Sequence, residues 1–229
     1  MNTTQSSENP SGLRLGLDVG SISVNTILLD SENTIIEEHY DYCHGQPFNV
    51  LKDRLSQLIE KYGNHIGPTA ITGTGGKLAC ELIGGDFVNE IVAESNAVSS
   101  MYPEVKSVIS MGGEDSKLFF MEKDQETGIS RLVDFKMNSI CAAGTGSFLD
   151  QQAKRIGVSI DKEFGELALQ SEKPPRIAGR CSVFAKSDMI HYQQIATPVH
   201  DIVAGLCFAV ARNFKSNIAK GKDLETPVL

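Results

Sequence analysis

The stretch LGLDVGSISVNTILLD, residues 15–30, places two apolar runs on either side of a small glycine turn, GSIS at residues 20–23. Apolar runs bounded by such a turn are typical of two antiparallel strands. A further run, NTIIEEHY at residues 33–40, follows the turn DSEN. The N-terminal part of the chain is therefore predicted to form a three-stranded meander.

The same pattern returns in the second half of the chain. VISMGGEDSKLFFM, residues 108–121, again joins two apolar runs through a glycine turn, and GGEDS stands where GSIS stood. Helical patterns follow each meander; the first meander is followed by helices at residues 47–63 and 88–103, and the second by one after Cys141 and one at residues 197–221.

This repetition predicts an α/β protein built from two related lobes, residues 13–105 and residues 106–229. The last four residues, TPVL, have the pattern of the first residues of a core strand. We therefore expect the second lobe to be incomplete and the chain to be part of a longer protein.

The composition narrows the class of protein. Of 229 residues, 41% are hydrophobic and 22% are charged, as in ordinary soluble domains, and no apolar run is long enough to span a membrane. A net charge of −8 argues against nucleic acid or an anionic membrane as a partner. Residues 1–12 are polar, lack a signal-peptide pattern and are expected to be a disordered leader. Five cysteines without a CxxC pair indicate no disulfide framework and favour the cytoplasm.

The two glycine turns carry residues suited to phosphate chemistry. Backbone amides in such turns can form a concave anion site. Asp18 precedes the first turn, and Glu114 and Asp115 lie in the second; these carboxylates can hold Mg²⁺ or its waters. The simpler alternative is that the glycines only permit tight hairpins. No Walker A loop is present.

Two of the five cysteines share an unusual context. Cys141 and Cys181 each stand directly before a helix-like segment, where the helix N-terminus favours a thiolate. Two cysteines cannot supply four thiolates, so a four-thiolate cluster would need a second copy of the chain. A zinc site shared by two chains is an alternative, and so is a nucleophilic cysteine, although none of the five histidines has a triad-like context. Cys207 lies among apolar residues and is expected to be part of the core.

These motifs resemble those of known proteins. The two glycine motifs are similar to the phosphate motifs of the superfamily of acetate kinase, the sugar kinases, actin and the heat-shock chaperone ATPases. MNSICAAGTGSFLDQQA, residues 137–153, and GRCSVFAKSDMI, residues 179–190, resemble one branch of it. That branch comprises the ATP-dependent activators of 2-hydroxyacyl-CoA dehydratases and the benzoyl-CoA reductase ATPase subunits. The resemblance extends from Leu13 to the C-terminus.

The resemblance implies two ribonuclease-H-like lobes with a cleft for ATP or ADP and Mg²⁺. It implies a homodimer with one 4Fe–4S cluster, held by Cys141 and Cys181 of each subunit. A ferredoxin or flavodoxin would supply an electron, and ATP would drive it to an iron–sulfur dehydratase or reductase. Asp18 and Asp115 are the catalytic residues implied, and Glu114 is expected to join them from its position in the second turn. The nucleotide-side residues implied are Asp18, Gly20, Ser21, Gly112, Gly113, Asp115, Gly144, Thr145 and Gly146.

The sequence departs from the resembled branch in two places. Many activators have glutamine where Glu114 stands, and an added carboxylate should alter the position of Mg²⁺ or of water. The adenosine-side glycine motif, expected after the TPVL segment, is not in the chain. Two other functions are kept as alternatives: a small-molecule kinase of the same superfamily, and an ATP sensor that gates a partner.

Overall fold

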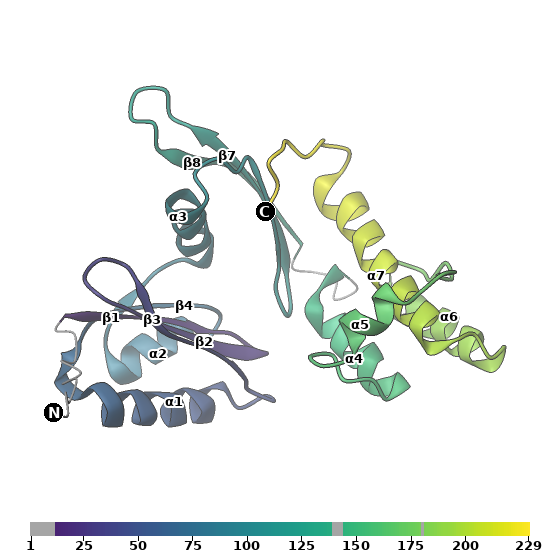
Figure 1. The fold of residues 1–229 in the computed structure, drawn as a ribbon, viewed down its shortest axis with the longest axis horizontal. Helices are drawn as coiled ribbons and strands as arrows, with labels where there is room; N and C mark the ends of the chain where they lie inside the picture. The colour runs from purple at the N-terminus through teal and green to yellow at the C-terminus, as the bar shows by residue number, and fades with distance from the viewer. Residues whose placement is uncertain (1–11, 139–143, 180) are drawn as a thin grey trace, which may run out of the picture. The chain divides into compact units, whose positions relative to one another are not determined.

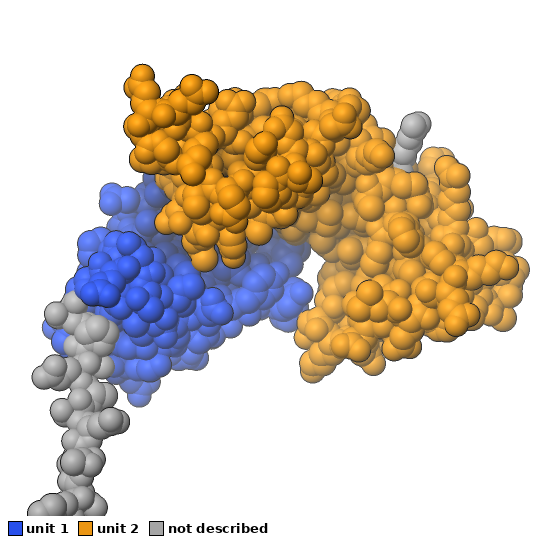
Figure 2. Space-filling model, turned by 45° about the horizontal axis from the view of Figure 1, so that its top comes forward, with its two compact units in different colours: residues 1–94 blue, residues 95–229 orange. Residues whose placement is uncertain are grey.

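The computed structural model describes residues 12–138, 144–179 and 181–229 (Figure 1). Nearly all of the expected leader, residues 1–12, lies outside these ranges, and Cys141 lies outside them as well. The chain divides into two compact units, residues 1–94 and residues 95–229 (Figure 2). No helix among the described residues is both long and apolar enough to cross a membrane.

The first unit is a five-stranded mixed sheet with two helices on one face (Figure 1). The strand order is β3-β2-β1-β4-β5, in which β1, β2 and β3 are antiparallel and β4 and β5 run parallel to β1. The elements are β1 (Leu13–Val19), β2 (Ser23–Leu29), β3 (Ile35–Tyr42), α1 (Pro47–Tyr62), the 3₁₀ turn η1 (Gly63–His65), β4 (Ile66–Thr72), α2 (Gly76–Ile83) and β5 (Asp86–Phe87).

Side-chain alternation along β1 decides which residues of the first unit reach the core. Every second residue from Leu13 to Val19 is buried, and these side chains form a core with Leu51 and Leu58 of α1. The intervening residues therefore project from the opposite face of the sheet. Asp18 is the last of them, so it is placed at the carboxyl end of β1.

The second unit repeats the meander and adds a cluster of helices. A three-stranded antiparallel sheet has the order β6-β7-β8. The elements are β6 (Ser107–Met111), β7 (Ser116–Lys123), β8 (Ser130–Asn138), α4 (Gly146–Ile156), α5 (Phe164–Leu169), α6 (Ser182–Gln194), α7 (Val199–Phe214) and the π-helical segment η3 (Lys215–Ala219). Before them, α3 (Glu90–Met101) contains the division between the two units.

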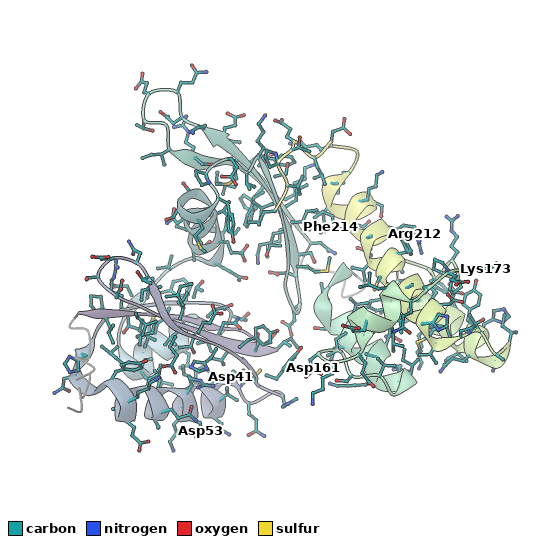
Figure 3. All side chains as sticks on the ribbon, in the orientation of Figure 1. Asp41, Asp53, Asp161, Lys173, Arg212 and Phe214 are labelled. Carbon is teal, nitrogen blue, oxygen red and sulfur yellow. The ribbon has the colours of Figure 1, made fainter. Side chains whose placement is uncertain are left out.

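α7 is the central element of the second unit. Its side chains Ile202, Val203, Leu206 and Val210 are buried in one core with residues of α4, α5 and α6. Phe214, which is labelled in Figure 3, lies at the C-terminal end of this helix and belongs to one buried cluster with Leu118 of β7. One helix therefore contacts both the helical part and the sheet of this unit.

The C-terminal residues complete the internal likeness between the units. Val228 is bridged in parallel to Ser107 of β6, and the amide of Leu229 donates to the Ser107 carbonyl at 3.0 Å. In the first unit, β4 pairs in parallel with β1 in the same way. The expected α/β fold is thus confirmed. The two compact units divide within α3, after Glu94. The repeated strand pattern, however, begins again at β6, so we still propose residues 13–105 and 106–229 as the two lobes.

Sequence patterns missed two short helices, α5 and α2, and placed others closely. The glycine-rich segment GTGG, residues 73–76, leads into α2. This helix has eight residues, too few for a clear helical period. The predicted helix at residues 197–221 is found as α7 followed by η3.

A polar cluster on the first unit gives a pH-dependent test of this fold. The Glu37 carboxylate on β3 accepts hydrogen bonds from Lys61 (2.5 Å) and Tyr62 (2.6 Å) of α1 and lies 2.6 Å from the His39 ring. The bonds from Lys61 and Tyr62 are the main cause that lowers the pKa of Glu37 from 4.5 to about 2. The ionised carboxylate therefore stabilises the fold above pH 4.5, and this contribution is lost as the pH falls towards 2.

Glu37→Gln should accordingly lower the free energy of unfolding at pH 7 by about 1–3 kcal/mol. The difference from the unmodified protein should shrink between pH 4.5 and pH 2. Denaturant unfolding across this pH range measures it, with Glu38→Gln at the adjacent exposed position as the control. An equal loss in both variants, or a loss that does not change with pH, would contradict the assignment.

Candidate functional site

The two predicted glycine turns have the same backbone geometry. The amide of Gly20 donates to the Ser23 carbonyl at 3.0 Å, and the amide of Gly112 donates to the Asp115 carbonyl at 2.9 Å. The turns are therefore equivalent hairpins, as their positions in the two meanders predicted. Because these bonds occupy the first amide of each turn, a phosphate would be bound by the next amides, those of Ser21 and Gly113.

Asp18 lies among polar groups at the end of β1. Its carboxylate accepts a hydrogen bond from the Asn25 side chain of β2 at 3.0 Å. Gly73, directly after β4, has a φ of +88°, and a Cβ there would collide with the Asp18 carboxylate and the Val19 carbonyl. The loop after β4 must therefore contain glycine here in order to close against Asp18.

Two buried oxygens beside Asp18 have hydrogen-bonding capacity that no described residue uses. Asn25 Oδ1 and Thr72 Oγ1 are buried and have no hydrogen-bond partner among the described residues. Both residues are the strand neighbours of Asp18, from β2 and β4 respectively. Asp18 and Asn25 also line a pocket of about 400 Å³. Buried oxygens normally have a partner, and a carboxylate with neighbouring neutral oxygens suits hydrated Mg²⁺.

The first turn is also fixed by a cysteine that the sequence left without a role. Cys43 follows β3 and is 2% exposed. Its thiol donates to the Ser21 carbonyl at 2.9 Å, and its amide donates to the Ile22 carbonyl at 2.9 Å. Cys43 thus holds the turn in place, which its position 22 residues after Ser21 gave no reason to expect.

In the second unit, Asp115 is held by a buried lysine. Lys117 Nζ lies 3.3 Å from Asp115 Oδ1, and the Lys117 side chain is only 1% exposed. Asp115 Oδ1 lies so close to Gly112 that a Cβ on this glycine would be 2.8 Å away from it. A buried cation needs a nearby anion, so this pair fixes the carboxylate over the turn. Glu114, in contrast, is exposed.

The second turn also holds the start of α4. The Gly146 amide donates to the Gly112 carbonyl at 2.9 Å, and the Ser147 amide donates to the Gly113 carbonyl at 2.9 Å. The Ser147 hydroxyl donates to the Gly113 carbonyl as well. A helix N-terminus has amides without partners inside the helix, and here the turn carbonyls satisfy two of them. Thr145 precedes the helix and is fully buried.

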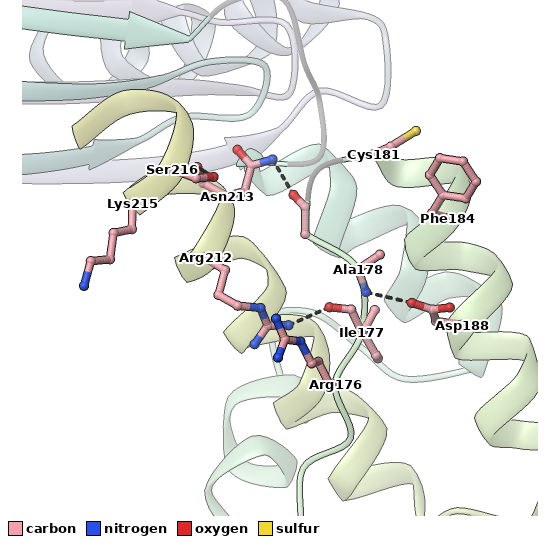
Figure 4. Close-up of a pocket in the computed structure, with 11 residues that line it drawn as sticks. Arg176, Ile177, Ala178, Cys181, Phe184, Asp188, Arg212, Asn213, Lys215 and Ser216 are labelled. Carbon is pink, nitrogen blue, oxygen red and sulfur yellow. Dashed lines mark hydrogen bonds between the residues drawn. The ribbon is translucent and has the colours of Figure 1, made fainter. Parts of the chain in front are cut away.

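Of the two predicted cluster ligands, Cys181 is within the described residues. It is a free, partly exposed thiol with extended backbone at the N-cap of α6, and its carbonyl accepts from the Ala185 amide at 3.0 Å. Its sulfur points away from Arg176 and Arg212, with which it lines a pocket of about 790 Å³ (Figure 4). Cys207 differs, because burial raises the pKa of its thiol.

The described residues of one chain do not form a complete metal site. Among the described residues, no group of three or more His, Cys, Asp or Glu side chains could hold a metal ion. Cys181 does fit a thiolate ligand, since it is free, accessible and placed at the positive end of a helix. Cys141, the second predicted ligand, lies outside the described residues.

Comparison with known proteins assigns this arrangement to a family. Residues 15–229 match the BadF/BadG/BcrA/BcrD ATPase family. The chain belongs to this family. As a member of an ATPase family it is a nucleotide-using enzyme, and its glycine turns lie in the matched region.

Two relatives of this family member are activators. The 2-hydroxyisocaproyl-CoA dehydratase activator of Clostridioides difficile is 31% identical over 212 residues, covering 90% of this chain and 75% of the relative. The (R)-2-hydroxyglutaryl-CoA dehydratase activating ATPase of Acidaminococcus fermentans is 32% identical over 199 residues, covering 86% and 74%. The crystal structure of component A of the latter dehydratase has a TM-score of 0.81 and 29% identity, covering 95% of this chain and 82% of that one.

A tightly packed glycine before Cys181 offers a test of this geometry. A Cβ at Gly179 would lie well inside 3.0 Å of the Ala209 backbone oxygen on α7. Gly179→Ala should therefore lower the free energy of unfolding by about 1–3 kcal/mol, because the loop must move off the helix. Gly165→Ala is the control, since a Cβ at that helical glycine meets nothing within 4 Å. Denaturant unfolding at neutral pH compares them; equal stabilities would disprove the close packing.

Proposed function

We propose that the chain is the ATP-dependent activator component of an iron–sulfur enzyme that acts on a CoA-linked substrate, of the 2-hydroxyacyl-CoA dehydratase type. The observation that carries the proposal is the likeness to component A over 95% of this chain. Sequence relatives with activator names support the same role. The kinase alternative is not favoured, because the named relatives in this family are activators and a reductase subunit.

The first-unit residues are proposed to orient Mg²⁺ and the nucleotide phosphates. Asp18 would accept a hydrogen bond from metal-bound water. The Asn25 and Thr72 oxygens beside it would supply further hydrogen-bonding groups for the same water or ion. The Gly20 and Ser21 turn would approach a phosphate through its backbone. No carboxylate binds phosphate directly at neutral pH, so Asp18 must act through the cation.

The second-unit residues are proposed to contact the phosphates from the second turn. Lys117 holds the Asp115 carboxylate in place, and the turn Gly112–Gly113 holds the N-terminus of α4. The main role proposed for Gly144, Thr145 and Gly146 is to fix the start of α4. Glu114 is exposed and free to reach a water or a metal ion from the turn.

We further propose that Cys141 and Cys181 of two copies hold one 4Fe–4S cluster in a homodimer. A two-fold axis would supply four thiolates from two per chain, the number that such a cluster requires. When bound, the cluster would supply one-electron transfer at low potential. Cys181 would present its sulfur from the N-terminus of α6, where backbone amides favour an anionic ligand.

The proposed partners follow from this role. A ferredoxin or flavodoxin would donate the electron, and an iron–sulfur dehydratase or reductase component would accept it. The net charge of −8 argues against nucleic acid or an anionic membrane as a partner, and the proposed donor and acceptor proteins are cytoplasmic.

Asp18→Asn should reduce ATP hydrolysis on the order of 10²-fold, the effect typical of losing one preorganised polar contact to the reacting group. The substitution keeps the side-chain shape but removes the charge that attracts the cation. Steady-state phosphate release at saturating Mg²⁺ measures it. Glu38→Gln is the matched control because Glu38 lines the same 400 Å³ pocket. Unchanged hydrolysis in Asp18→Asn would exclude the proposed role.

Cys181→Ser should abolish the cluster. After anaerobic reconstitution with iron and sulfide, the unmodified dimer should hold about four irons, and the variant should retain only background iron. Cys80→Ser, which changes another free and partly exposed cysteine on α2, should keep the full iron content. Iron absent from the unmodified protein, or lost equally in both variants, would refute the cluster assignment.

A further inference from the structure

Asn213 on α7 belongs to none of the motifs above, yet its side chain is completely buried. It lies one residue after Arg212 and one before Phe214, in the part of α7 that faces both the sheet and the loop before α6. A buried amide must satisfy both its donors and its acceptor inside the protein. Its contacts therefore show which parts of the fold it holds together.

The donor end of Asn213 contacts the loop that leads to Cys181. Asn213 Nδ2 donates to the Gly179 carbonyl, two residues before Cys181 (Figure 4). The backbone of Gly179 packs directly against that of Ala209, which lies one helical turn before Asn213 on α7. Because a side chain at Gly179 would push the loop away, the glycine and the amide together fix the loop on the helix.

Neighbouring bonds hold the same loop on both sides. Arg212 Nη2 donates to the Ile177 carbonyl at 2.5 Å, and the Ala178 amide donates to Asp188 Oδ2 of α6 at 2.8 Å (Figure 4). The loop is thus tied to α7 through two side chains and to α6 through one. A displacement of α7 at Asn213 would be carried to the start of α6.

The acceptor end of Asn213 faces the segment that leads into α4. A Cβ on Gly144 would lie 2.5 Å from Asn213 Oδ1, so the backbone of Gly144 sits directly against the amide. The Gly144 carbonyl accepts a hydrogen bond from Ser116 Oγ at 2.6 Å. Ser116 follows Asp115, the last residue of the second glycine turn. Asn213 Oδ1 also accepts from Asn217 Nδ2 at 3.1 Å.

We propose that Asn213 is a positioning residue that links the second glycine turn to the Cys181 loop; this rests on the proposed function. The contacts form one continuous series in the second unit: from the turn to Ser116, to Gly144, to Asn213, to Gly179 and Cys181. A contiguous set of packed and hydrogen-bonded groups of this kind can carry energetic coupling between two sites. Nucleotide at the turn would then alter the surroundings of the Cys181 thiol through Asn213.

The test measures Cys181 in the cluster-free protein. Alkylation of Cys181 by iodoacetamide, followed by mass spectrometry of its peptide, should change at least about fivefold when a Mg²⁺–ATP analogue is added, the lower end of ordinary coupling between sites. In Asn213→Asp the shape is kept but the donor to Gly179 is lost. Its nucleotide affinity should stay within about threefold, while the nucleotide effect on alkylation should fall below about twofold.

Asn217→Ala is the matched control, because it removes one bond to Asn213 and leaves both the Gly144 and the Gly179 contacts. It should keep the nucleotide effect. If Asn213→Asp does not fold by circular dichroism, Gly144→Ala breaks the same junction from the other side. Because Gly144 is itself a proposed nucleotide-side residue, this variant is compared at a concentration of analogue measured to saturate it, and it should give the same loss. A full nucleotide effect in the Asn213 or Gly144 variant would overturn the inference.

The unmodified protein separates this inference from the proposed function. If it binds the analogue and assembles a cluster but Cys181 alkylation does not respond, Asn213 is only a structural residue and the proposed function stands. If it neither binds nucleotide nor assembles a cluster, the proposed function and the inference fail together.

Discussion

The hydrogen bonds from the first amides of α4 to the carbonyls of Gly112 and Gly113 tie the second glycine turn to the helical part of the second unit. They join a β-hairpin turn to a helix that begins 34 residues later in the chain. Two groups that would otherwise lack partners are satisfied at once: the free amides of the helix start and the carbonyls of an open turn. Any ligand that moves this turn must therefore move α4 or break these bonds.

Close packing around α7 extends this constraint. Gly144 contacts Asn213, and Gly179 contacts Ala209, one helical turn away. Both glycines lie near the predicted cysteine ligands in sequence, Gly144 three residues after Cys141 and Gly179 two before Cys181. The absence of a side chain at each lets the backbone lie directly on the helix. The loop before Cys181 is consequently packed and hydrogen-bonded onto α7.

Local sequence patterns were sufficient to predict the features that depend on nearby residues. Asp18 was predicted beside the first turn from its position in the sequence. The two glycine turns, GSIS and GGEDS, were recognisable because the residues that close each hairpin are only three apart. Helix α2 was missed because eight residues carry too little periodicity. The second unit repeats the first closely enough that its sheet could be predicted from the repetition alone.

Features that depend on distant contacts could not be predicted in this way. Lys117 looked like an ordinary strand residue, and only the fold shows that it is buried against Asp115. Asn213 lies 34 residues from Gly179, and Cys43 lies 22 from Ser21, so no local pattern connects them. Family resemblance identified the motifs, but the groups that hold the motifs in place are visible only in three dimensions.

In the proposed function, nucleotide binding acts on a one-electron cluster held by Cys141 and Cys181 of two copies. The most direct measurement is electron paramagnetic resonance of the anaerobically reconstituted, chemically reduced dimer, recorded with and without Mg²⁺–ATP. A one-electron-reduced cluster signal whose shape changes on adding nucleotide is expected. A protein that hydrolyses ATP normally but gives no cluster signal, or a signal that nucleotide leaves unchanged, would contradict the claim.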